Sequence, residues 1–239
     1  MSWDSGATLD EIVQTGLLGR LTSEDNGFFT FERAPLLLSK KEEAIARAGR
    51  AIWLDQPAGW FAAKGSDINS LAGWIPDCIA ARPFLATSSS SCWKCGDSTP
   101  VHCLALPQGH LSLEFRDDDE DDGESEGAVE WRLADCGTFI SNLTLVNGSV
   151  QRYLKTACPS YCLDFSKKAE GSYFMNHCKH CGAKLGDFFM HNEPGGAFFP
   201  TTEGAARGIT LRSIDATLLA CGGTSVQSPD YMPCCTVQP

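Results

Sequence analysis

Two short segments of the chain share the pattern Cys-x-x-Cys-Gly, and this repeat constrains the fold more than any other feature. The segments are residues 92–96 (CWKCG) and 178–182 (CKHCG). Two intervening residues let both sulfurs of a pair reach one ion, and the glycine permits a tight turn whose amide groups can point at the thiolates. Because a closed tetrahedral site needs four ligands, the repeat predicts one structural Zn2+ ion held by Cys92, Cys95, Cys178 and Cys181.

Each motif lies between segments of strand-like composition, which is typical of a zinc ribbon. The 82 residues between Cys95 and Cys178 would then form a long insertion between the two halves of the ribbon. No thioredoxin-like pattern of strands and helices surrounds either pair, which argues against a redox role. Four thiolates would leave no open position for water, so this site is expected to be structural and not catalytic.

Another combination of ligands could complete a metal site around the second motif. Cys158 and Cys162 lie just upstream, but three residues separate them and no glycine follows. His177 and His180 flank the cysteines of the second motif and could replace one of them. We therefore keep Cys158, Cys162, His177 and His180 as alternative metal ligands.

The cysteine content and the first residues of the chain bear on its compartment. Twelve cysteines with two Cys-x-x-Cys pairs favour metal binding in a reducing compartment over disulfide bonds. The start of the sequence, MSWDSGATLDEI, carries acids and no apolar stretch typical of a signal peptide. No apolar run reaches the ~18 residues of a membrane span. We therefore expect a cytoplasmic protein with no membrane partner.

The net charge of −11 is concentrated in one segment. Residues 114–130 contain ten acids and one base, for a local charge of −9, which leaves −2 for the rest of the chain. Residues 117–127 (DDDEDDGESEG) are therefore expected to form a solvated acidic loop. No basic stripe that could neutralise phosphates is present, so a protein partner is favoured, and nucleic acid remains an alternative without support from charge.

The overall pattern predicts an α+β protein with four parts. These are an N-terminal extension over residues 1–35, a small Trp-rich α+β unit over 36–77, a mainly antiparallel zinc-ribbon-like domain over 78–220, and a tail over 221–239. Within the Trp-rich unit, Ser39 and Glu42 form a capping box for a helix that Gly49 ends, and a hairpin and a second helix follow. Leu143, Val146, Val150 and Leu154 have helical spacing, with a break expected at Asn147 and Gly148. Residues 208–219 are expected to form a strand and a helix.

The Trp-rich unit resembles a short domain of unknown function that occurs beside conjugative-plasmid primases and antirestriction proteins. The resemblance covers roughly 40 residues and departs from the family pattern where Leu54 separates Trp53 from Asp55. It suggests a binding surface made of Trp53, Trp60, Phe61 and Trp74, whereas the alternative is a hairpin whose aromatics pack a small core. The matching residues are Lys41, Ala44, Gly49, Trp53, Trp60, Phe61, Gly65, Trp74 and Pro76.

Residues 173–200, together with the first cysteine motif, resemble uncharacterised zinc-ribbon proteins of bacterial plasmids and phages. This resemblance implies a metal and a mobile-element context, and it implies no reaction. We therefore expect a non-catalytic zinc-binding accessory or interaction protein. Two alternatives remain, an inhibitor whose acidic loop mimics phosphates and an enzyme of unrecognised type. No phosphate-binding loop, nucleophile elbow or dinucleotide fingerprint supports the enzyme.

Overall fold

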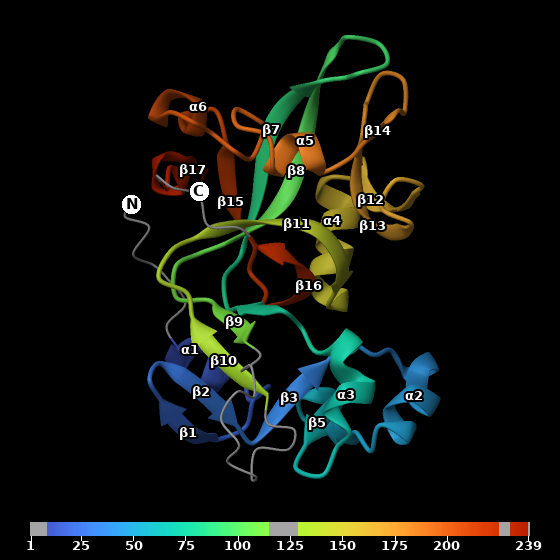
Figure 1. Cartoon of the computed structure of the whole chain (residues 1–239), viewed down its shortest axis with the longest axis vertical. Coiled ribbons are helices and arrows are strands. Elements are labelled where there is room, and N and C mark those ends of the chain that lie inside the picture. Colours follow the sequence, from blue (N-terminus) through green and yellow to red (C-terminus); the bar gives the residue numbers. More distant parts are fainter. Residues whose placement is uncertain (1–8, 115–128, 225–229, 239) are drawn as a thin grey trace.

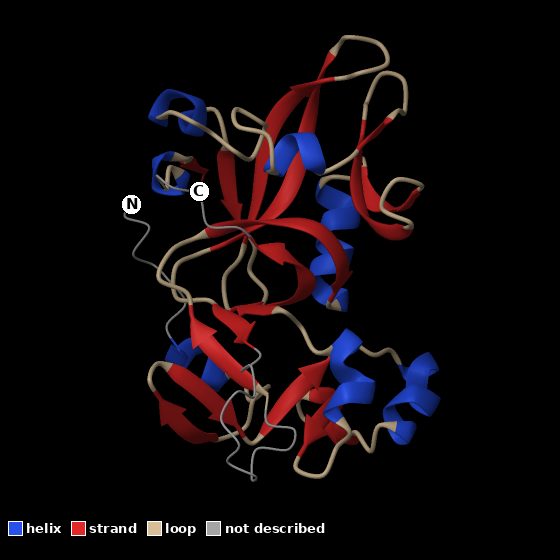
Figure 2. Cartoon of the chain, in the orientation of Figure 1, coloured by secondary structure: helices blue, strands red, loops and turns tan. Residues whose placement is uncertain are grey.

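A mixed sheet of eleven strands forms the framework of the chain (Figures 1 and 2). The structure, a computed structural model, describes residues 9–114, 129–224 and 230–238, so the expected acidic loop lies outside the described residues. The pairs within the sheet are antiparallel except for β15 and β17, which are parallel. In order across the sheet, its strands are β1 (Leu21–Asp25), β2 (Phe28–Phe31), β10 (Glu130–Leu133), β9 (Leu111–Glu114), β6 (Cys78–Ala80), β16 (Leu218–Thr224), β11 (Thr138–Val146), β8 (Ser98–Leu106), β7 (Phe84–Ser91), β15 (Thr210–Ser213) and β17 (Thr236–Gln238).

Two three-stranded sheets and a set of short helices complete the described part, which is therefore mainly β and α+β in the broad sense. None of the described helices is long and apolar enough to cross a membrane. One small sheet joins β3 (Arg33–Leu36), β5 (Ala58–Ala63) and β4 (Ile52–Asp55), and the other joins β12 (Tyr161–Ser166), β13 (Gly171–His177) and β14 (Lys184–Leu185). The helices are α1 (Leu9–Gln14), η1 (Lys40–Glu42), α2 (Glu43–Ala48), α3 (Ile68–Leu71), η2 (Ala72–Trp74), α4 (Gly148–Ala157), α5 (Phe188–His191), α6 (Glu203–Arg207) and η3 (Met232–Cys234).

The helices of residues 36–77 begin and end close to the predicted positions. The backbone N–H of Ser39 donates to Glu42 Oε2 at 2.8 Å, which is one half of the predicted capping box. Gly49 follows α2 with an ordinary negative φ, so it is not needed for a left-handed turn. A Cβ at Gly49 would lie 2.5 Å from the Leu71 side chain, so this glycine allows α2 and α3 to approach closely.

One hydrophobic cluster, which we call the aromatic end, joins three of the predicted parts. It contains Ile12 and Phe29 from residues 1–35, Trp60 from the Trp-rich unit, and Trp131 from the segment after the acidic loop. Strand β2 also pairs with β10, which is far away in the sequence. The N-terminal extension and the Trp-rich unit therefore share one core with β9 and β10. The strands and helices of these segments lie together in the lower half of Figure 1.

The expected tail begins inside a central strand. Cys221 lies in β16, which pairs with β6 on one side and with β11 on the other. Gly222 and Gly223 are typical of such a tail, but a Cβ at Gly222 would meet Ile140 Cγ2 at 2.8 Å and Ser141 O at 3.0 Å. Glycine is therefore present at position 222 because β11 and β16 approach closely there.

The helix expected from Leu143 onward starts later. Leu143 and Val146 belong to β11, and α4 begins at Gly148 with Asn147 as its N-cap. Their spacing imitates a helix because β11 is irregular between Ser141 and Leu145, where its pairing with β16 shifts. Residues 208–219 likewise contain strand β15 and the start of β16, and no helix lies between them.

A side chain connects the large sheet to the small sheet of β12, β13 and β14. The backbone N–H of His102 in β8 donates to Asn176 Oδ1 at 2.7 Å, and Asn176 Nδ2 donates to the carbonyl oxygen of His102 at 2.8 Å. The Asn176 amide thus takes the place of a neighbouring strand. Because Asn176 is nearly fully buried and lies two residues before Cys178, this contact fixes the position of the second cysteine motif relative to β8.

Candidate metal centre

The two cysteine motifs lie in turns at the same end of the molecule (Figure 1). The first knuckle, residues 92–97, connects β7 with β8, and the second knuckle, residues 178–183, connects β13 with β14. In the first knuckle, the N–H of Cys92 donates to the carbonyl oxygen of Asp97 at 2.9 Å, and the N–H of Gly96 donates to the carbonyl oxygen of Cys92 at 2.9 Å. The second knuckle repeats both bonds at the matching positions, at 2.9 and 2.8 Å.

The glycine of each motif is required by the backbone conformation. Gly96 has a φ of +78° and Gly182 a φ of +68°, which are values that residues other than glycine rarely adopt. A Cβ at either position would meet nothing within 4 Å, so space is not the reason. The left-handed glycine closes the turn that brings the second cysteine of each pair back beside the first.

The four predicted sulfurs converge on one point. The sulfur atoms of Cys92, Cys95, Cys178 and Cys181 all lie within 4.8 Å of one another. Cys92 Sγ is 3.6 Å from Cys181 Sγ, and Cys95 Sγ is 3.7 Å from Cys178 Sγ. A tetrahedral zinc ion with Zn–S bonds of about 2.3 Å requires sulfurs about 3.8 Å apart, whereas a disulfide requires about 2.05 Å. The cluster therefore could hold one metal ion, and its thiolate chemistry fits zinc.

Two thiols of the cluster, those of Cys178 and Cys95, have pKa values shifted in opposite directions. Burial raises the pKa of Cys178, but the backbone N–H groups of Cys181 and His180 and the neighbouring thiols stabilise its thiolate, and the pKa falls to about 6. The Asp97 amide favours ionisation of Cys95, yet burial and the bonds to the other three sulfurs raise its pKa to about 12. Cys178 therefore ionises more readily than Cys95, and the thiols of Cys92 and Cys95 are its side-chain hydrogen-bond partners.

The knuckles bury little besides sulfur. Cys92 and Cys178 are 2% and 3% exposed and pack against Val101, Leu185 and Met190. Residues 93–97 are all exposed, as are Lys179, His180 and Gly182. Hydrophobic burial therefore contributes little to the folding of the two loops, which leaves the four sulfurs as their main common contact.

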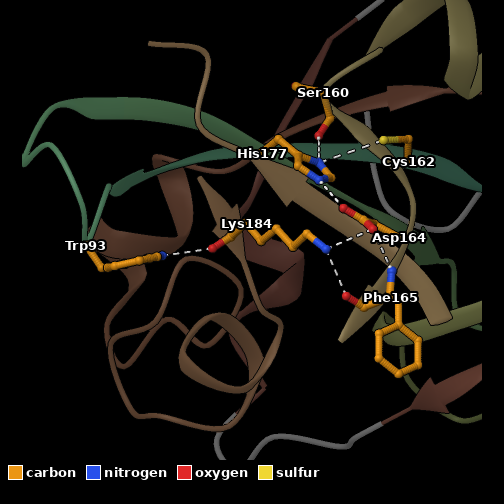
Figure 3. Close-up of polar contacts among 7 residues, drawn as sticks. All are labelled: Trp93, Ser160, Cys162, Asp164, Phe165, His177 and Lys184. Carbon is orange, nitrogen blue, oxygen red and sulfur yellow. Dashed lines mark hydrogen bonds and ion pairs between the residues drawn. The ribbon is translucent and has the colours of Figure 1, made fainter. Parts of the chain in front are cut away.

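Neither of the histidines kept as alternative ligands belongs to the sulfur cluster. Both ring nitrogens of His177 have protein partners, Nδ1 with the carbonyl oxygen of Ser160 at 3.1 Å and Nε2 with Asp164 Oδ2 at 3.1 Å (Figure 3). His180 Nε2 lies 3.2 Å from the carbonyl oxygen of Ser98. Among the described residues, the metal-ligand cluster contains the four cysteines and no histidine.

The two alternative cysteines lie elsewhere. Cys158 is buried at the end of α4, where its thiol donates to the carbonyl oxygen of Leu154 at 3.4 Å. Cys162 is exposed on β12, with its sulfur 3.8 Å from His177 Nδ1 (Figure 3). Nothing in the described chain brings either sulfur into the cluster. Both could be recognised from the sequence only as cysteines near the second motif.

Lys184 connects the two knuckles to β12 (Figure 3). Its carbonyl oxygen accepts a hydrogen bond of 2.8 Å from Trp93 Nε1, and its Nζ contacts Asp164 Oδ1 at 2.9 Å and the carbonyl oxygen of Phe165 at 2.9 Å. Lys184 and then His177 lower the pKa of Asp164 well below its usual range. Asp164, Lys184 and the Asn176 bridge were not identified from the sequence, because their partners lie on other strands and no local spacing marks them.

Two of the four aromatics expected to form a binding surface are core residues. Trp60 and Phe61 are 6% and 1% exposed on the central strand β5, which lies between β3 and β4. Trp60 packs into the aromatic end, whereas the Phe61 ring lies under the Arg33 guanidinium at 5.3 Å. Trp74 is half-buried against the same cluster. Trp53 remains 36% exposed, and its ring meets Trp60 edge-on at 5.3 Å. A surface made of all four is therefore wrong, and the packing alternative describes Trp60 and Phe61.

Comparison of the chain with protein-family models, with curated proteins and with solved structures found no match. The resemblances of the Trp-rich unit and of residues 173–200 therefore stay predictions. The four-cysteine cluster rests on its own geometry, and that geometry suggests a zinc site.

Proposed function

We propose that this protein is a non-catalytic, zinc-stabilised interaction protein of the cytoplasm, in which one zinc ion joins the two knuckles of a ribbon. The observation that carries the proposal is the convergence of four cysteine sulfurs within 4.8 Å from two matching turns. Four thiolates would complete the coordination of zinc and leave no position for a reacting water. A mobile-element context is part of the proposal and is supported by the sequence resemblance alone.

An exposed aromatic beside the cluster supports the interaction role. The Trp93 side chain is 74% exposed, and its hydrogen bond to the Lys184 carbonyl holds the ring in one orientation. Fixed, exposed tryptophans are frequent anchors of protein interfaces because they offer a large contact area with little loss of entropy. The sequence contains no basic stripe that could neutralise phosphates, so a protein is proposed as the partner.

The metal content of the purified chain tests the zinc site directly. Elemental analysis should find one zinc per chain, and removal of the metal by a chelator should make four thiols newly reactive, beyond those of the twelve cysteines that react or stay buried in the zinc-bound protein. Cobalt(II) substituted for zinc should give the absorption of a tetrahedral tetrathiolate site. No metal, or only three protected thiols, would refute the closed site.

The interaction role needs a separate measurement. Mobility-shift assays with single-stranded and double-stranded DNA and RNA should show no binding at physiological salt, and Trp93→Ala should keep full zinc content. Specific nucleic-acid binding that is lost in Trp93→Ala would replace the protein partner with a nucleic acid.

A further inference from the structure

Strand β7 has one edge that is only partly covered. Strand β15 pairs with residues 84–87 of β7 and begins opposite Thr87, because the chain leaves α6 at Gly208 just before Thr210. Residues 88–91, which are four serines, pair with β8 on one side. Within the described chain, no strand pairs with their other side. This stretch of β7 is therefore an open sheet edge.

The backbone groups that point out of this edge can be assigned. In an antiparallel pair, residues alternate between positions that exchange hydrogen bonds and positions that do not. Pro100 lies opposite Ser89 and has no N–H, so this pair cannot exchange both bonds. His102 lies two residues after Pro100 in β8. Its N–H and C=O face away from β7 toward Asn176, which fits the same alternation. Ser89 and Ser91 therefore direct their N–H and C=O groups to the open edge.

The open edge faces a groove of about 480 Å3. Two separate segments line the groove, residues 88–91 of β7 and residues 193–197 after α5, and we call the second segment the opposite wall. Ala205 and Ile209 also line it, and Ile209 directly precedes β15. The opposite wall is tightly packed, since a Cβ at Gly196 would lie 2.4 Å from the carbonyl oxygen of Phe189. The groove is thus lined both by the open edge of β7 and by a closely packed segment after α5.

We propose that this groove binds an extended segment of a partner protein, which adds to the edge of β7 as a further strand. Ser89 and Ser91 offer two N–H donors and two carbonyl acceptors at the spacing of an extended backbone. Glu193 is the single charged residue among those that line the groove, so a segment with a basic side chain is favoured. The proposal deepens the proposed interaction function by naming the kind of segment that binds.

The same features disfavour other occupants. A nucleic-acid strand would place phosphates near Glu193 and would leave the alternating donors and acceptors of β7 without matching groups. A second copy of the chain joined through this edge would give a dimer, which size-exclusion chromatography detects. The proposed ligand of the groove is therefore a short extended peptide with at least one lysine or arginine.

The test begins with a displayed library of random linear decapeptides, selected against the full zinc-loaded chain. The best peptide is synthesised, and its Kd is measured by fluorescence anisotropy for the wild type and for Ser89→Pro. This substitution removes an N–H that points to the groove and breaks no bond within the sheet, so we expect unchanged zinc content and at least tenfold weaker binding. Glu193→Lys, a second variant on the opposite wall, should weaken a basic peptide and spare an uncharged one.

Two further readouts separate strand addition from side-chain binding. The peptide should slow amide hydrogen exchange at Ser89 and Ser91. Two N-methylated versions of the peptide, one methylated at its odd-numbered and one at its even-numbered nitrogens, should differ, because only one set of N–H groups faces β7. The version methylated at that set should not bind. A selected peptide that binds Ser89→Pro as well as wild type, a library without binders, or a dimer through this edge would overturn the proposal. Because zinc content is measured on the same samples, loss of the groove and loss of the metal site are distinguishable.

Discussion

The metal end and the aromatic end of the molecule are held together in different ways. The aromatic end packs Phe29, Phe31, Trp60 and Trp131 into one cluster, so its stability is spread over many contacts. The metal end, by which we mean residues 84–106 and 171–198, finishes in two knuckles whose residues are mostly exposed. Removal of one cysteine ligand should therefore unfold the two knuckles of the metal end. A single substitution in the aromatic end should lower the stability only in part, because many other contacts remain.

The largest effect is expected from a substitution of one ligand. Cys95→Ser or Cys181→Ser should abolish stoichiometric zinc binding and lower the free energy of unfolding by more than about 5 kcal/mol, because structural zinc supplies roughly 10–16 kcal/mol of apparent binding energy. Zinc analysis and urea denaturation measure both effects. Cys162→Ser is the matched control, since Cys162 is exposed and outside the cluster. A Cys95→Ser protein with normal zinc and stability would rule out the assignment.

A substitution in the aromatic end should give the converse result. Trp131 is fully buried in that cluster, and Trp131→Ala should cost about 3–5 kcal/mol through lost burial and the cavity that remains. Zinc stoichiometry should stay at one per chain, because no sulfur ligand touches this core. If Trp131→Ala also released the zinc, the two ends would be one cooperative unit and the comparison would fail.

A smaller effect is expected from the backbone of the second knuckle. Gly182→Ala should destabilise the zinc-bound protein by about 1–2 kcal/mol, because alanine is strained at a positive φ. Thermal unfolding and competition with a chelator report stability and zinc affinity. Gly73→Ala is a suitable control, since Gly73 has a negative φ and open space around its Cα. Equal effects of the two substitutions would show that the turn does not depend on the left-handed conformation.

The smallest effect concerns a buried carboxyl group at the foot of the metal end. Burial raises the pKa of Asp187 to about 7, although the N–H of Asn142 donates to its carboxylate. The native state therefore binds this proton more tightly than the unfolded state, and this contribution to stability is lost as pH rises from about 4 through 7. Asp187→Asn keeps the acceptor for Asn142 and removes the titration.

The stability of Asp187→Asn relative to the wild type should accordingly increase between pH 4 and pH 8. Urea denaturation at several pH values measures the difference. His191 is buried nearby with its pKa lowered to about 4, and it affects stability in the opposite direction over a similar range. Because His191 is present in both proteins, its contribution cancels in the comparison. A pH-independent difference would mean that Asp187 is ionised throughout.

The cysteine cluster could be predicted from the sequence because its information is local. Two residues between paired cysteines and a glycine after them determine each turn, and two equal turns imply a common site. The burial of Trp60 and Phe61 could not be decided from the sequence, because it depends on the central place of β5 between β3 and β4 and on packing against residues far away in the chain. The place of Gly222 was misjudged for a similar reason, since a glycine that admits a neighbouring strand has the same sequence appearance as a glycine in a tail.

The general class of fold could be predicted, and the continuous eleven-stranded sheet could not. Strand β16 pairs Ala220 with Cys78, and β10 pairs Trp131 with Phe29, over separations that leave no periodic signal. The helical spacing that included Leu143 was a consequence of the bulge in β11, where Asn142 has a φ of +48° and its N–H donates to Asp187. Long-range pairing and bulges therefore account for most of the differences.

The proline in β8 has a consequence for the accuracy of folding. The four consecutive serines of β7 are interchangeable, so the pairing of this stretch with residues 98–101 of β8 could shift by one residue with little change on the β7 side. Such a slip would place Pro100 opposite Ser88 or Ser90, where β8 must donate an N–H that proline lacks. The misaligned hairpin would also change the length of the first knuckle and carry Cys92 and Cys95 away from their partners. Pro100 thus favours the strand register that places Cys92 and Cys95 correctly, although it is not itself a metal ligand.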